Sequence, residues 1–407
     1  MIVIRAEWIC PITGPPIANG WIAVDHGRIA ALGAADVLPA GAPVRELGNV
    51  AVLPALVNAH THIELSWLRG RVPPAPNFID WITHLFTTRG GRHERPDDPS
   101  VVEPAREAIR ELRESGVGAV GDISNSLASV APLKDAGLHA VVFHELLGFN
   151  LPHGERIDQT RGARDAARRV GGDIVRVSIA PHACYSVSPE MFRAIRDELD
   201  RSSVRITSIH VGESASEMEF LELGTGAWPT VLRWVGSWVE GWQPPRCGPV
   251  EFLESLRFLD ASTLVVHGVQ LSDESLRALA AIGCTLVTCP RSNQWVGVGS
   301  PPIARFYESG IPVAVGTDSL ASVADLNVFS ELKEMRWLAP DVPARAVLAS
   351  ATIVGARALG LGHQLGSIED GKLAELIAVQ LPDRLSHDVE EHLVSGIEPR
   401  QISWVRE

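Results

Sequence analysis

Eight short apolar runs dominate the middle of this 407-residue chain, and amphipathic, helix-like stretches separate them. The runs cover residues 51–62, 116–124, 139–148, 173–182, 204–213, 263–271, 285–293 and 312–321. Nearly continuous apolar runs are typical of strands that are buried on both faces of a parallel sheet, and such a sheet needs helical crossovers between its strands. The alternation therefore predicts an α/β fold with a (β/α)₈ TIM-type barrel.

The two ends of the chain have a different pattern. Residues 1–52 alternate apolar and polar positions between turns that contain Gly and Pro, as in "GWIAVDHGRIAALG", and residues 360–407 have the same character. This pattern is typical of short antiparallel strands. We therefore predict a small β-sandwich formed by residues 1–52 together with 360–407, and a barrel domain over residues 53–359.

Composition restricts the partners and the location of the protein. The formal net charge of -13 argues against a surface for nucleic acid or anionic membrane, since both bind basic patches. No apolar run reaches the roughly 20 residues of a membrane span, and the first residues lack the layout of a signal peptide. The five scattered cysteines include no C-x-x-C pair, which favours reduced thiols. We expect a cytoplasmic protein.

Most of the apolar runs end in a residue that can take part in chemistry. These residues are His60, His62, Asp122, His144, Glu145, His182, His210, Glu213, His267, Arg291, Asn293 and Asp318. The C-terminal ends of barrel strands meet at one rim, where the active sites of this architecture are built. Polar residues also collect wherever strands reach solvent, but that accounts for one or two cases and not for five runs that carry a histidine at or near their ends.

Four of these residues suit one metal ion. His60 and His62 form an H-x-H, whose two side chains lie on the same face of an extended strand, and the fifth and eighth runs supply His210 and Asp318. An H-x-H alone also fits a structural pair at a strand end. Three imidazoles, one carboxylate and an open position for water suit a catalytic Zn²⁺, with Fe²⁺ as the alternative.

The order of the motifs "NAHTH", "HVGES", "VHG", "CPRSN" and "GTDS" resembles the amidohydrolase superfamily, in particular its cytosine/adenosine-deaminase-like and chlorohydrolase-like branch. The resemblance covers essentially the whole chain. It implies that the four residues above are the metal ligands and that Glu213 shuttles protons. It also implies that His267 orients the hydroxide or polarises the substrate.

These implied roles are chemically consistent with hydrolytic deamination. A divalent cation lowers the pKa of its bound water towards about 7, and Asp318 is placed to accept the proton. Glu213 is placed to protonate a ring nitrogen while hydroxide attacks the adjacent carbon and ammonia leaves. Binuclear relatives carry a carboxylated lysine at the end of the fourth strand. This chain reads "SIAPHACYS" there, with His182 and no lysine. A mononuclear site is therefore expected.

By resemblance we expect a metal-dependent aminohydrolase that acts on an adenine-type nucleoside, such as aminodeoxyfutalosine, adenosine or a 5′-modified adenosine. Guanine or cytosine deamination and triazine-type dechlorination are the alternatives within the enzyme class. A non-catalytic scaffold relative is the alternative from another class, although such proteins typically lose metal ligands that are all present here. Barrels of this family often pair, so a homodimer is expected.

Five further residues are candidate substrate contacts: His182, Trp67, Glu145, Arg291 and Ser319. In nucleoside-deaminating relatives the motif "PHAPYS" carries a histidine that contacts substrate, which implies the same for His182. Trp67 belongs to an insert from residue 63 to about 100 that is long enough to form a lid. Ordinary packing of Trp67 and a structural ion pair of Glu145 are the alternatives.

Overall fold

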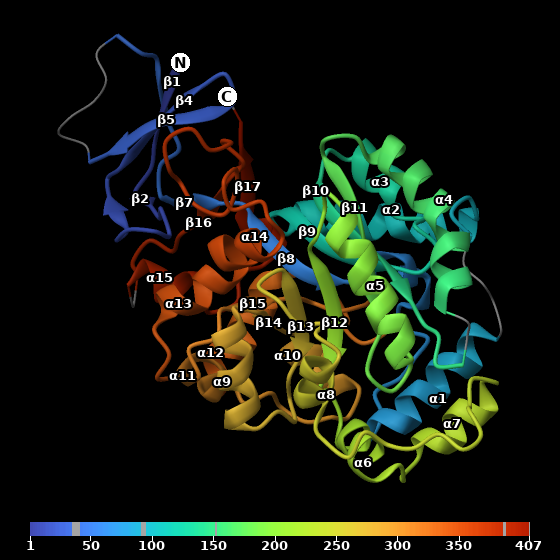
Figure 1. Cartoon of the computed structure of the whole chain (residues 1–407). Helices are drawn as coiled ribbons and strands as arrows, with labels where there is room; N and C mark the ends of the chain where they lie inside the picture. The colour runs from blue at the N-terminus through green and yellow to red at the C-terminus, as the bar shows by residue number, and fades with distance from the viewer. Residues whose placement is uncertain (35–40, 91–94, 151–152, 386–387, 407) are drawn as a thin grey trace.

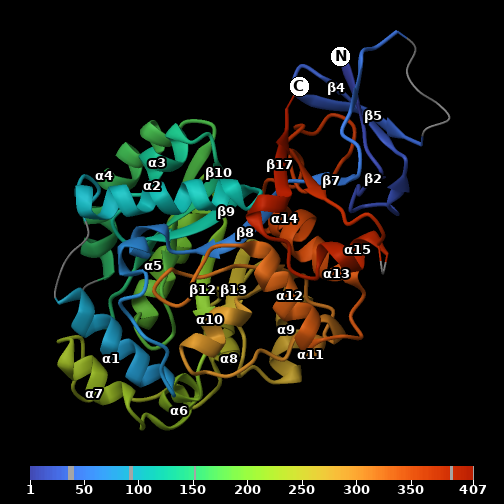
Figure 2. The ribbon, with the colours of Figure 1, turned by 180° about the vertical axis from the view of Figure 1, so that it is seen from behind.

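The computed structural model describes residues 1–34, 41–90, 95–150, 153–385 and 388–406. It shows a mixed α/β protein with two parts (Figure 1). A small β-rich part carries both termini, and a larger part surrounds parallel strands with helices. Seen from behind, the same small part lies at one end of the molecule (Figure 2).

The small part contains two sheets, with strand orders β5-β4-β1-β6 and β17-β16-β7-β2-β3. Its strands are β1 (Ile2–Arg5), β2 (Trp8–Ile9), β3 (Ile17–Ala18), β4 (Trp21–Asp25), β5 (Arg28–Gly33), β6 (Val44–Glu46), β7 (Val50–Pro54), β16 (Leu376–Gln380) and β17 (Ile402–Val405). β16 pairs antiparallel with both β7 and β17, so the two chain ends share one sheet. Ile4 and Ile22 of one sheet and Val52 of the other belong to one apolar cluster, as in a β-sandwich.

Eight further strands form two parallel sheets of four, ordered β11-β10-β9-β8 and β12-β13-β14-β15. They are β8 (Leu56–Thr61), β9 (Val117–Ser124), β10 (His139–Leu146), β11 (Val175–Pro181), β12 (Thr207–Val211), β13 (Thr263–His267), β14 (Thr285–Thr288) and β15 (Val313–Val315). Each of the eight predicted runs contains one of these strands. Two isolated parallel bridges, Thr61–Asp318 and Ala183–His210, link the two sheets at both pairs of edges.

Two predicted runs differ from the structure in instructive ways. The run 51–62 is not one strand, because β7 ends at Pro54 and pairs with the small part, whereas β8 starts at Leu56 and pairs with β9. In the run 285–293 the strand ends at Thr288, and Pro290 begins a helix, a position that proline favours. Arg291 therefore lies on a helix and not at a strand end.

Helices connect the parallel strands and cover them. They are α1 (Phe78–Arg89), α2 (Pro99–Glu114), α3 (Val130–Asp135), α4 (His153–Gly171), α5 (Pro189–Arg201), α6 (Ala215–Leu223), α7 (Trp228–Trp234), α8 (Pro249–Ser255), α9 (Asp273–Ile282), α10 (Pro290–Trp295), α11 (Ile303–Glu308), α12 (Val328–Leu338), α13 (Ala344–Ala349), α14 (Gly355–Ala358) and α15 (Val389–Leu393), with the 3₁₀ helices η1 (Ile63–Leu68) and η3 (Pro399–Gln401) and the π-helix η2 (Ser350–Val354). Within the described ranges, none of them has the length and apolar character needed to cross a membrane.

The insert after β8 forms η1 and α1, and residues 91–94 of the predicted insert lie outside the described residues. α1 lies beside α7 at the end of the molecule away from the small β part in both views (Figures 1 and 2). The rings of Phe78 and Trp228 are 6.2 Å apart, and those of Phe86 and Trp234 are 5.9 Å apart. These two helices, 139 residues apart in sequence between Arg89 and Trp228, form a roof over the strand ends.

Candidate metal centre and active-site cavity

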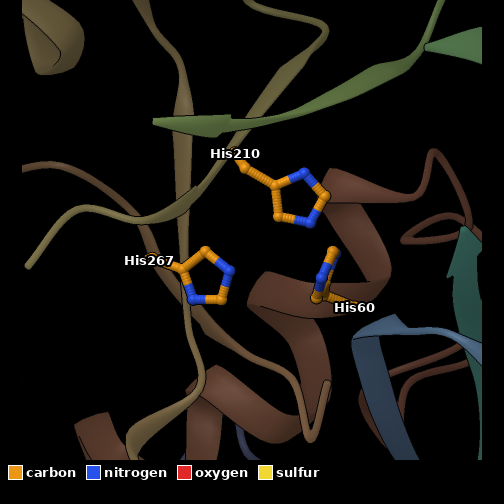
Figure 3. Close-up of side chains that lie close together, drawn as sticks. All are labelled: His60, His210 and His267. Carbon is orange, nitrogen blue, oxygen red and sulfur yellow. The ribbon is translucent and has the colours of Figure 1, made fainter. Parts of the chain in front are cut away.

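Three histidines converge from the C-terminal ends of three strands. His60 comes from β8, His210 from β12 and His267 from β13. Their rings point toward one another (Figure 3), with centroid distances of 5.0 Å for His60–His210, 5.8 Å for His60–His267 and 5.4 Å for His210–His267. One ring nitrogen of each lies within 4.8 Å of those of the other two, so the three can face one ion.

His62 and Asp318 complete the cluster around His60. The Asp318 Oδ1 atom lies 3.5 Å from His62 Nε2 and 3.9 Å from His60 Nε2. The rings of His62 and His210 are 5.5 Å apart. The structure thus brings together all four residues that the sequence predicts as metal ligands.

The burial and protonation of His60 suit a metal ligand. Its side chain is fully buried, and neither ring nitrogen has a hydrogen-bond partner among the described residues. Burial, together with the neighbouring histidines, holds the pKa of His60 well below its usual range. Burial likewise lowers the pKa of His62 to about 3. Neutral imidazoles with unused lone pairs are the form that binds Zn²⁺, whereas a buried nitrogen without any partner costs about 1–3 kcal/mol.

Hydrogen bonds from outside the cluster orient the candidate ligands. His210 Nδ1 donates to the backbone oxygen of His182 at 2.9 Å, which leaves His210 Nε2 unprotonated toward the cluster. Ser292 Oγ donates to Asp318 Oδ2 at 2.6 Å, and Ser322 Oγ donates to the same atom at 3.2 Å. Oδ1 of Asp318 is therefore the oxygen that faces the histidines.

Unusual backbone geometry places two of these side chains. His267 has φ 75° and Asp318 has φ 60°, the left-handed region that non-glycine residues rarely adopt. Such residues cost of order 1–3 kcal/mol and cluster at functional sites.

Close contact between β8 and the segment after β15 is also required, because a Cβ atom at Gly316 would lie 2.6 Å from the backbone oxygen of His60. Asn58 Nδ2 donates to Thr317 Oγ1 at 2.7 Å and holds β8 to this segment.

Glu213 lies at the cavity side of the cluster. Its Oε1 atom is 3.6 Å from His267 Nε2, and the side chain is almost completely buried. Burial raises the pKa of Glu213 well above its usual range, and the nearby carboxylates of Asp318 and Glu217 add to this effect. A raised pKa favours the protonated carboxyl group, which is the form that acts as a general acid. Asn293 Nδ2 donates to His267 Nδ1 at 3.0 Å and directs the other ring nitrogen toward Glu213.

A cavity of about 480 Å³ opens above the cluster, within the range of small-molecule sites. Its polar floor comprises His62, Asn125, Glu145, His182, Ser186, His210, Glu213, His267, Asp318 and Ser319. Its apolar roof comprises Phe78, Trp81, Ile82, Leu85 and Phe86 of α1 with Trp228, Val231 and Leu232 of α7. Arg89, the last residue of α1, also lines it.

Three of the five predicted substrate contacts line this cavity. They are Glu145, His182 and Ser319. His182 is close to the cluster, with its ring 5.0 Å from that of His210, and burial lowers the pKa of His182 to about 4. Its Nδ1 atom lies 2.6 Å from Ser186 Oγ, which leaves the second nitrogen for other contacts.

Arg291 and Trp67 are not among the lining residues, contrary to the prediction. Arg291 points away because its Nε donates to Glu331 at 2.7 Å and its Nη1 donates to Asp325 at 2.9 Å. Trp67 is buried in the core and lies under the guanidinium of Arg71 at 5.7 Å. The tryptophan of the insert that lines the cavity is Trp81.

Sequence reasoning missed Asn125, Tyr185 and the α7 side of the roof. Tyr185 stands in "PHACYS", only three residues after His182, so its position after the fourth strand was a usable signal. Its ring stacks on Trp228 at 3.8 Å. No sequence pattern relates Trp228 to Tyr185, because their contact depends on how α7 folds over the rim.

The chain is similar in sequence and in fold to known proteins. Residues 51–403 match the model of the amidohydrolase family. The 5-methylthioadenosine/S-adenosylhomocysteine deaminase of Moorella thermoacetica is 30% identical over 420 residues, which cover 99% of this chain and 92% of that protein. The crystal structure of Helicobacter pylori aminofutalosine deaminase in complex with methylthio-coformycin has a TM-score of 0.85 and 26% identity, and it covers 97% of this chain and 95% of that one.

A second similar structure is an adenosine deaminase from Xanthomonas campestris with bound zinc. Its TM-score is 0.83 at 25% identity, and the match covers 98% of this chain and 90% of that one. The family model spans most of the chain, from the strand before the H-x-H to the last strand. This protein therefore belongs to the amidohydrolase family.

Proposed function

We propose that this protein is a metal-dependent deaminase that hydrolyses the exocyclic C–N bond of an adenine-type nucleoside. The observation that carries this proposal is the convergence of four candidate ligands and the buried acid Glu213 on one cavity of nucleoside size. The activities in the names of the Moorella and Helicobacter relatives support the same reaction class.

We further propose that His60, His62, His210 and Asp318 hold one divalent cation. Zn²⁺ is the first candidate, which the zinc in the Xanthomonas structure supports, and Fe²⁺ is the alternative. When bound, such a cation lowers the pKa of water and so supplies hydroxide at neutral pH.

Glu213 and Asp318 then divide the proton transfers. Neutral Glu213 donates its proton to the ring nitrogen next to the amino-bearing carbon, which makes that carbon electrophilic. As water adds there, Glu213 takes one of its protons and returns to the neutral state. Asp318 accepts the other proton and passes it to the amino group, which leaves as ammonia. His267 faces the same space and orients the attacking oxygen.

The remaining floor and the roof bind the rest of the nucleoside. Glu145 accepts hydrogen bonds from sugar hydroxyls, and His182 contacts the same part of the sugar. Ser319 is the third polar contact at the floor. The aromatic residues of α1 and α7 cover the base and the 5′ group, for which flat apolar surfaces are well suited.

We also infer that the two parallel sheets close into one (β/α)₈ barrel, which the bridges at both pairs of edges support. The barrel domain would span residues 53–359, and residues 1–52 with 360–407 would form the β-sandwich. The expected homodimer stays a prediction, and light scattering on the purified protein tests it. The cytoplasmic location also stays a prediction.

A substrate panel tests the function. The protein is loaded with zinc, iron or manganese, and ammonia release and the ultraviolet spectrum are followed with adenosine, 5′-deoxyadenosine, methylthioadenosine, S-adenosylhomocysteine and aminodeoxyfutalosine. Guanine, cytosine and a chlorotriazine, with chloride release, represent the alternatives. We expect turnover of at least one adenine nucleoside. A protein that binds metal but turns over none of these compounds would support the scaffold alternative instead.

A further inference from the structure

Glu64 is a buried carboxylate that lies beside the cavity without lining it. It follows the H-x-H by two residues, on η1, and its side chain is 1% exposed. The short segment of residues 124–126, at the end of β9, donates hydrogen bonds to both oxygens of this carboxylate. Glu64 Oε1 accepts from the backbone nitrogen of Asn125 at 2.7 Å. Glu64 Oε2 accepts from Ser124 Oγ at 2.6 Å, from Ser126 Oγ at 2.7 Å and from Ser126 N at 3.1 Å.

Asn125 carries this restraint toward the cavity. Its Nδ2 donates to Glu145 Oε2 at 3.0 Å and to the backbone oxygen of Glu145 at 3.2 Å. Both partners can only accept, so the orientation of the amide is fixed. The backbone oxygen of Asn125 accepts from His144 Nε2 at 3.2 Å. Asn125 is therefore held at its backbone nitrogen, its backbone oxygen and its side chain.

The restraint ends at Glu145, which lines the cavity. Its Oε2 is held by Asn125, and its Oε1 lies 3.7 Å from His210 Nδ1. Because Glu145 is only 5% exposed, a wrong rotamer would leave its buried carboxylate without the Asn125 donor. The direction of its free lone pairs therefore depends on where Asn125 holds it.

We propose that Glu64 is a positioning residue for substrate recognition. It clamps the turn at residues 124–126 and, through Asn125, aims the Glu145 carboxylate at the hydroxyl groups of the substrate sugar. With one carboxylate oxygen of Glu145 held by Asn125, the other oxygen can accept from hydroxyl donors. This inference rests on the proposed function, since it takes the ligand to be a nucleoside.

The Glu64→Gln variant tests the clamp. One carboxylate oxygen of Glu64 would become an amide nitrogen, which cannot accept from the hydrogen-bond donors that face it. We expect KM for the best adenine nucleoside to rise about tenfold or more, with kcat changed less than about threefold and metal content unchanged. If the variant does not fold, Asn125→Ala replaces it and removes the link while keeping the clamp. A fall in kcat at constant KM would overturn the proposal.

A double-mutant cycle separates positioning from general stability. We expect Glu64→Gln to have no further effect on kcat/KM once Glu145 is replaced by Ala, because Glu64 acts only through Glu145. Fully additive effects would contradict this route. Glu198→Gln is the matched control: this carboxylate pairs with Arg164 at 3.0 Å on the outer helices, so its loss should lower stability but leave KM unchanged.

Hydrogen exchange gives a readout that needs no substrate. In Glu64→Gln we expect faster exchange of the backbone amides of Asn125 and Ser126, the two that Glu64 accepts, whereas Glu145→Ala should leave their exchange slow. Unchanged exchange in Glu64→Gln would overturn the clamp. If the unaltered protein deaminates no adenine nucleoside, the proposed function fails, and the exchange result still decides whether the clamp exists.

Discussion

At the scale of single residues, Glu213 is the side chain on which turnover depends most directly. Glu213→Gln keeps the size of the side chain and removes the transferable proton. We expect kcat to fall by about 10²–10⁴, the usual contribution of a general acid–base residue. Bound metal, measured by elemental analysis, should stay constant because Glu213 is not in the ligand set. Unchanged turnover would exclude Glu213 from the proton transfers.

Glu217 lies behind Glu213 and makes a separate prediction about pH. Its Oε2 accepts from the backbone nitrogen of Glu213 at 3.0 Å, and burial raises the pKa of Glu217 from 4.5 to about 7. The folded state therefore favours the neutral carboxyl. Its stabilising contribution is complete below pH 4.5 and is lost as pH rises through 7. At about 1.4 kcal/mol for each pKa unit, the loss is on the order of 3 kcal/mol.

The Glu217→Gln variant measures this contribution, because its neutral amide keeps an oxygen for the Glu213 backbone nitrogen. We expect the free energy of unfolding to fall less between pH 5 and pH 8 in the variant than in the unaltered protein. Denaturant unfolding of the metal-loaded proteins at both pH values provides the comparison. Equal pH dependence would show that Glu217 is ionised in the folded state.

Single residues differ in how well the sequence alone predicts their place in the site. His60, His62, His210 and Asp318 could be found because strand ends of a barrel share one rim, whatever their separation in sequence. Arg291 could not be judged, because its direction depends on the helix that begins at Pro290 and on the partner Glu331, 40 residues later. The sequence also does not show that Asn125 links Glu64 to Glu145.

At the scale of elements, the strands could be predicted and the roof could not. Apolar runs reveal buried strands because both faces must be apolar. They did not separate β7 from β8, since the two strands are equally buried although they serve different sheets. The contact of α1 with α7 joins segments whose sequences only show that each has an apolar face. The cavity roof is therefore a result of tertiary packing.

Trp81 tests the function of this roof. It lies on α1, lines the cavity and is 7% exposed. For Trp81→Ala we expect KM to rise roughly tenfold with kcat within about threefold, because the lost apolar contact affects binding more than proton transfer. Trp337→Ala is the matched control, since Trp337 is 71% exposed on α12. A loss of kcat without a change in KM would place Trp81 at the reacting atoms.

At the scale of the whole molecule, the two parts are joined where the site begins. Only Ala55 separates β7 of the small part from β8, which carries His60. A second connection joins the last strand of the small part to the large part: the indole Nε1 of Trp404 in β17 donates to the backbone oxygen of Arg113 in α2 at 2.8 Å. The guanidinium of Arg113 lies 3.7 Å from the centre of the same ring. The two parts are thus connected both by the chain and by packing.

We therefore expect both parts to unfold in one cooperative transition, and Trp404→Ala to shift that transition as a whole. Loss of the hydrogen bond and of the cation–π contact should cost about 2 kcal/mol. Differential scanning calorimetry, with the calorimetric and van't Hoff enthalpies compared, is the measurement. Trp337→Ala, an exposed tryptophan of the large part, should leave the transition unchanged. Two separate transitions, of which Trp404→Ala shifts only one, would show that the small part folds independently of the metal-site strands.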